Sequence, residues 1–182
     1  MQPRLDDAIA VLTSDACDPI VEMVLCARDG AVEAHAPDGS VRFTADGPVQ
    51  VRGRNPLGRQ DPGAMSPLQA ERAAPRPHRT QNHYPFAYDN IAHLFDDPRA
   101  PDLAVVHTPS HNWEAIGGHR GEHGSCDLIQ SRAPLIVAGR GIKRLGSIPD
   151  AARMIDIAPT LTYLAGGARR PDGMLLARQH GR

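Results

Sequence analysis

The sequence predicts an α/β fold in which a small antiparallel β meander precedes a segment of alternating helices and strands. Residues 19–52 alternate apolar and polar positions between short turn signals, as the strands of a meander do. Residues 84–167 contain apolar runs of strand length between stretches with helical periodicity. This order of elements is typical of a layered α/β sandwich.

The first two elements follow from the spacing of apolar residues. Leu5, Ile9 and Leu12 recur at helical spacing, which predicts a short helix within residues 1–14. The apolar run at residues 19–27 is expected to be a strand. A helix followed directly by a strand fits the start of an α/β layer.

Two turn signals divide the rest of the meander. Pro37-Asp38-Gly39 separates two stretches with period-2 character, because proline presets φ and glycine accepts positive φ. Asp46-Gly47 offers a second turn before the last strand. Five prolines then interrupt residues 53–82, which we expect to be a long loop.

Regular structure is expected to return after this loop. Residues 86–97 have their apolar side chains on one helical face. Residues 103–107 and 133–139 are apolar runs suited to buried strands. Between them, residues 108–127 form a loop rich in histidine and glycine.

A final helix is expected at residues 156–167. Asp156 is placed to cap it, and Pro159 falls in the first turn, where proline is tolerated. Gly166 and Gly167 give a stop signal at its end.

The composition excludes several classes of partner. The 182 residues carry a formal net charge of -1 and contain no run of five basic residues, so neither nucleic acid nor an anionic membrane is expected as a partner. No run of 18 apolar residues predicts a membrane span. The acidic N-terminal stretch does not fit a signal peptide, so a cytoplasmic location is expected by default. The length suits one domain or part of a larger one.

The unusual chemistry lies in a histidine loop, residues 107–123, which holds four of the nine histidines: His107, His111, His119 and His123. Neutral imidazole is a good zinc ligand, and a loop after a buried strand can aim it. The spacing of His119 and His123 does not make a zincin helix, because glycines surround them. The alternative is a loop whose histidines only bind backbone or water. The three cysteines have no zinc-knuckle spacing and are expected to be small buried apolar residues.

A resemblance rests on the stretch GEHGSCDLIQSRAPLIVAGRGIKRLG and, after it, ARMIDIAPTLTYLAGG. In order, Gly121-Glu122-His123-Gly124, residues 133–141 and residues 156–161 resemble a metal-binding G-x-HG segment, a strand with a glycine-rich turn, and a D-x-A-P-T-L helix. This order is similar to the alkaline phosphatase superfamily, especially its type I phosphodiesterase and nucleotide pyrophosphatase branch. The match covers residues 84–167 and reaches the meander only loosely.

The resemblance implies an alkaline-phosphatase-like α/β sandwich, with residues 1–182 as a partial, C-terminal part of that domain. It implies a divalent metal, zinc, and hydrolysis of small-molecule phosphate mono- or diesters. By motif match His123 is the late metal ligand, with His119 beside it. The family's nucleophile, a threonine or serine, comes from the N-terminal half of its domain, and no matching segment is found here. We therefore expect a truncated chain that is inactive on its own.

Two alternatives stay open. One is a non-catalytic remnant of the fold that binds a metal or a partner chain. The other is a relative of the sulfatases or phosphoglycerate mutases, which share the scaffold. The segment that would separate these classes is not found in this chain.

Overall fold

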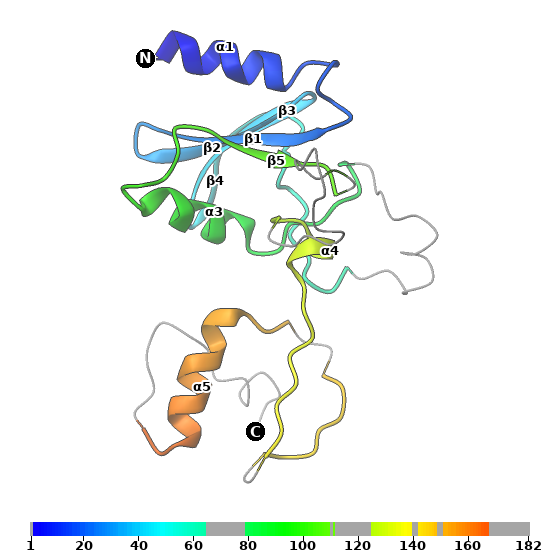
Figure 1. Ribbon diagram of the computed structural model, residues 1–182, viewed down its shortest axis with the longest axis vertical. Helices are drawn as coiled ribbons and strands as arrows, with labels where there is room; N and C mark the ends of the chain where they lie inside the picture. Colours follow the sequence, from blue (N-terminus) through cyan, green and yellow to red (C-terminus); the bar gives the residue numbers. More distant parts are fainter. Residues whose placement is uncertain are drawn as a thin grey trace, which may run out of the picture. The chain divides into compact units, whose positions relative to one another are not determined.

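The computed structural model describes residues 2–64, 79–109, 111, 125–139, 142–148 and 151–167. The chain divides into two compact units, Met1–Arg132 and Ala133–Arg182. The first unit holds a mixed α/β fold in which one five-stranded antiparallel sheet lies between two helices (Figure 1). The expected α/β class is thus confirmed at this coarse level.

The sheet has the strand order β4-β3-β2-β1-β5, and every neighbouring pair is antiparallel. The expected meander is confirmed as the first four strands, and the expected strand near residues 103–107 is confirmed as the fifth. That fifth strand is half-buried rather than buried, because it forms an edge of the sheet. The strands are β1 (Val21–Arg28), β2 (Ala31–Ala36), β3 (Gly39–Thr44), β4 (Gly47–Gly53) and β5 (Ala104–His107).

Tight turns fix the register of the meander. Asp29 and Gly30 have φ of 49° and 72° between β1 and β2, as both central residues of a type I′ hairpin require. At the next hairpin, a Cβ on Gly39 would lie 2.2 Å from the carbonyl oxygen of Arg54, so only glycine fits there. The expected turn at Pro37-Asp38-Gly39 is confirmed, whereas sequence analysis missed the turn at Asp29.

Each face of the sheet packs against one helix (Figure 1). The first helix, α1 (Gln2–Leu12), confirms the expected N-terminal helix and buries Ile9 against Val24 and Cys26. The other helix, α3 (Ala87–Asp96), matches the helix expected at residues 86–97 and buries Ile91 on the opposite face. Burial of each large apolar side chain stabilises the fold by about 1.5–3 kcal/mol.

The larger core lies on the α3 face. Phe43 from β3 is fully buried there, and its ring centroid lies 5.1 Å from that of Tyr88. Tyr84 and Leu57 complete this core from the connection between β4 and α3, so both described ends of that connection are tied to the sheet. The described parts of residues 53–82 contain turns and no helix, as expected, while residues 65–78 lie outside the described residues.

The second unit contains a 3-10 turn, η1 (Met154–Asp156), and the helix α5 (Ile157–Leu164), which confirms the expected final helix. Its cap differs from the prediction. The carboxylate of Asp156 accepts the backbone N–H of Arg153 at 2.8 Å and gives no side-chain cap to α5. The expected stop is confirmed, since Gly166 has φ of 82° directly after the helix.

The strand expected at residues 133–139 is wrong. These residues form no strand, and Ile136 is 87% exposed. An apolar run forms a strand only when another strand satisfies its backbone groups, and the described residues of the second unit hold none. Among the described residues, no helix has the length and apolar character needed to cross a membrane.

Candidate metal centre at the end of strand β5

Two histidines of the histidine loop meet at Thr108, directly after β5. The ring Nδ1 of His107 lies 2.8 Å from the carbonyl oxygen of Thr108. The ring Nδ1 of His111 lies 2.7 Å from the Thr108 hydroxyl. One residue therefore holds both imidazoles in place.

These contacts orient the two rings. The carbonyl oxygen of Thr108 only accepts, so Nδ1 of His107 is the donor in that contact. The Thr108 hydroxyl lies 3.1 Å from the carbonyl oxygen of Pro19 and 2.7 Å from Nδ1 of His111. It has one hydrogen to donate, so the roles in its contact with His111 depend on the tautomer of that ring. Metal-binding histidines are oriented by contacts of this kind at their second ring nitrogen.

A short segment before and within β1, residues 18–22, anchors this arrangement. The backbone N–H of Thr108 donates to the carbonyl oxygen of Ile20 at 2.8 Å. Arg79 reaches the same segment from the loop, where it pairs with Asp18 and donates to the carbonyl oxygen of Val21 at 3.3 Å. Backbone contacts on a sheet strand give the histidines a rigid support.

Glu22 extends this anchored segment into the core. It lies in the register irregularity of β1 between Val21 and Met23, and such bulges re-aim a side chain. Its carboxyl group is 2% exposed, and it accepts hydrogen bonds from Asn82 at 2.7 Å and from the Tyr84 hydroxyl. Burial and the adjacent Glu22 raise the pKa of Tyr84, so its phenol stays a donor.

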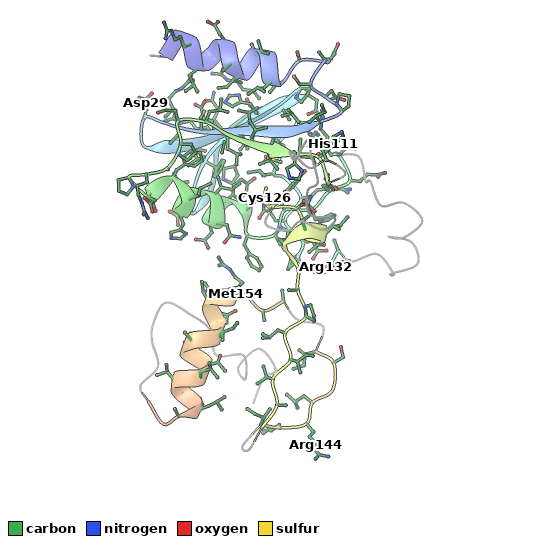
Figure 2. All side chains as sticks on the ribbon, in the orientation of Figure 1. Asp29, His111, Cys126, Arg132, Arg144 and Met154 are labelled. Carbon is green, nitrogen blue, oxygen red and sulfur yellow. The ribbon has the colours of Figure 1, made fainter. Side chains whose placement is uncertain are left out.

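The chain after the histidine loop is held against His83, which precedes α3. The short helix α4 (Leu128–Ser131) docks through the backbone N–H of Leu128, which donates to the carbonyl oxygen of His83 at 2.7 Å. Asp127 caps this helix by accepting the N–H groups of Ile129 and Gln130. His111 and Cys126 are labelled in Figure 2, and residues 112–124 between them lie outside the described residues.

Several polar side chains around the start of α4 are buried. Burial, and next the charge of Asp127, raise the pKa of the Cys126 thiol to about 12. The second carboxylate oxygen of Asp127 is buried and has no hydrogen-bond partner among the described residues. The same is true of one side-chain atom each of His83, Ser125 and Gln130. Buried polar atoms normally bind protein, water or an ion, so these side chains are suited to bind a polar ligand.

The predicted ligands His119 and His123 lie outside the described residues. Of the four loop histidines, the structure brings His107 and His111 together through Thr108. Sequence analysis missed Thr108 and Glu22, because a threonine in a loop and a glutamate in a strand carry no motif. Only the pairing of β5 with β1 places Thr108 beside residues 89 positions away.

A search against models of protein families finds no match, and the same holds for comparisons with curated proteins and with solved structures.

Proposed function

We propose that the chain carries the C-terminal part of an alkaline-phosphatase-like, metal-dependent hydrolase of phosphate mono- or diesters. The proposal combines the resemblance at Gly121-Glu122-His123-Gly124 with one observation from the structure. Thr108 contacts Nδ1 of both His107 and His111, and metal-binding histidines are oriented by such contacts at their second ring nitrogen.

In this proposal His107 and His111 hold zinc from the described side of the loop, and His123 and His119 are the further ligands that the sequence predicts. Bound zinc would supply a Lewis acid that polarises a phosphoryl oxygen. The chain's own residues contribute orientation, since Thr108 and the segment around Pro19 fix the rings against the sheet. The substrate class is a small-molecule phosphate ester.

The threonine or serine nucleophile that the resemblance implies has no matching segment in this sequence. We therefore expect the isolated chain to bind zinc but to turn over little or no substrate.

The test measures zinc by elemental mass spectrometry and hydrolysis of bis(p-nitrophenyl) phosphate by the purified chain. We expect His123→Ala to lower the zinc content by one equivalent, and the wild-type chain to show no robust turnover. Zinc that survives His123→Ala would contradict the ligand assignment. Robust turnover would contradict the missing nucleophile.

A second candidate is a non-catalytic module that binds a partner chain. The exposed apolar run Leu135, Ile136 and Val137 favours it, because apolar segments of this length are usually covered. Co-expression with the product of an adjacent upstream reading frame tests this candidate. We expect a complex that Ile136→Asp weakens; two chains that elute separately at high concentration would contradict it.

A further inference from the structure

A second group of metal-binding side chains lies in the hairpin of β1 and β2, on the face of the sheet that packs against α1. Cys26 stands opposite Glu33 in the strand register, and His35 follows Glu33 on the same face of β2. The thiol, one carboxylate oxygen and one ring nitrogen of these residues all lie within 4.8 Å of one another. Cys26 faces α1, where it packs with Ile9.

We propose that Cys26, Glu33 and His35 bind a thiophilic divalent cation of the zinc type, at a site separate from the histidine loop. A thiolate, an imidazole and a carboxylate are the three side-chain types that bind zinc in proteins. Three protein ligands leave the fourth position to water. The proposal does not depend on the proposed hydrolase function.

The distances fit one small ion. Zinc–ligand bonds of about 2.0–2.3 Å place tetrahedral ligand atoms about 3.3–3.8 Å apart. Nε2 of His35 and Oε2 of Glu33 already lie 3.0 Å apart, joined by a hydrogen bond. For Nε2 to bind the ion, the neutral His35 ring would carry its proton on Nδ1 instead, and the Cys26 thiol would lose its proton to solvent as the sulfur–metal bond forms. Only small side-chain shifts on two rigid strands are required.

The surrounding charges determine which carboxylate oxygen can bind. Nη1 of Arg42 lies 3.4 Å from Oε1 of Glu33, which orients the carboxylate and leaves Oε2 on the side of His35. Arg28 is only 3.9 Å from Glu33 and makes its close ion pair with Asp6 of α1 at 2.5 Å. The two guanidinium groups lower the affinity for any cation, so the thiolate is the ligand on which binding depends.

A cation bound here would link strands β1 and β2 through their side chains beneath α1. Ligands that bind only the folded state raise its stability in proportion to their concentration over their dissociation constant. Asp29, labelled in Figure 2, marks the tight turn that holds Cys26 and Glu33 opposite each other. We therefore expect added zinc to raise the melting temperature through this hairpin.

Cobalt(II) titration of the full chain tests the proposal, since a thiolate ligand gives a charge-transfer band in the near ultraviolet. To remove the histidine loop from the readout, the titration uses the His107→Gln/His111→Gln background. We expect the band to saturate at one equivalent and to vanish in Cys26→Ser. The matched controls Cys17→Ser and Cys126→Ala are expected to keep it.

A band that survives Cys26→Ser, or no band at all, would overturn the proposal and leave an ion-pair network without a metal. Circular dichroism checks that Cys26→Ser folds. If it does not fold, His35→Gln decides the question, because this half-buried residue is replaceable without opening the core. We expect His35→Gln to lower cobalt affinity at least 10-fold and to abolish the zinc-dependent rise in melting temperature; unchanged values would refute the site.

Discussion

The hydroxyl oxygen of Thr108 lies 2.7 Å from Nδ1 of His111. The same hydroxyl lies 3.1 Å from the carbonyl oxygen of Pro19, which ties it to the segment before β1. Nδ1 of His107 lies 2.8 Å from the carbonyl oxygen of Thr108. Thr108 thus contacts both of the histidines in the described part of the loop that we propose as metal ligands.

Replacing Thr108 by valine should weaken zinc binding at the histidine loop. Valine keeps the shape but removes the hydroxyl that hydrogen-bonds with Nδ1 of His111, and loss of such an outer contact typically costs about 10- to 100-fold in metal affinity. Competition titration against a zinc chelator measures the change. Thr108→Ser is the matched control, since it keeps the hydroxyl, and its affinity should stay close to wild type. Equal affinities for all three chains would show that Thr108 does not support the site.

Tyr84→Phe should destabilise the first unit. The substitution removes one of the two donors to the same oxygen of the buried Glu22, leaving Asn82, and the loss of one such hydrogen bond costs about 0.5–1.5 kcal/mol. Urea denaturation gives the free energy of unfolding. Tyr163→Phe serves as control because that side chain is 53% exposed, so its effect should be near zero. An equally small effect for Tyr84→Phe would mean that Glu22 does not depend on this hydrogen bond.

Acid should weaken the pair formed by Asp38 and Arg54. The Arg54 guanidinium lowers the pKa of Asp38 in the folded state. A lowered folded-state pKa stabilises the fold above the unfolded-state pKa of about 3.9, and this contribution is lost as pH falls through the folded-state value. The pair is partly exposed, so the effect should stay below about 1 kcal/mol. The stability difference between wild type and Asp38→Asn should therefore shrink below pH 4. A difference that grows with acid would contradict a lowered pKa of Asp38 in the folded state.

Cys26 and Cys126 should both react slowly with disulfide reagents at neutral pH while the protein is folded. Burial raises the pKa of Cys26 to about 11 and that of Cys126 to about 12, so few of these thiols are ionised. A time course with Ellman's reagent should show both reacting slowly in the native protein and quickly in denaturant. Single Cys→Ala variants assign each phase. Rapid native reaction of Cys26 would mean that the hairpin face is open to solvent.

Local patterns were sufficient to predict most elements of the first unit. Helical spacing around Ile9 and turn signals such as Pro37-Asp38-Gly39 act over a few residues, and the structure confirms them. The turn at Asp29-Gly30 was equally readable, and with it the pairing of Cys26 with Glu33 would have followed.

Contacts between residues far apart in the sequence could not be predicted from local patterns. The contact of Thr108 with Pro19 spans 89 residues, and that of Tyr84 with Glu22 spans 62. Both depend on which strands pair, which local spacing does not specify. The error at residues 133–139 has the same origin, because an apolar run becomes a strand only where a partner edge exists.

The central claim is that the histidine loop binds a metal through His107 and His111. Elemental mass spectrometry of the zinc-loaded full chain, beside His107→Gln/His111→Gln and Thr108→Ser, tests it most directly. The account predicts that the double variant loses one equivalent of zinc and that Thr108→Ser loses none. The same zinc content in the wild type and the double variant would contradict it.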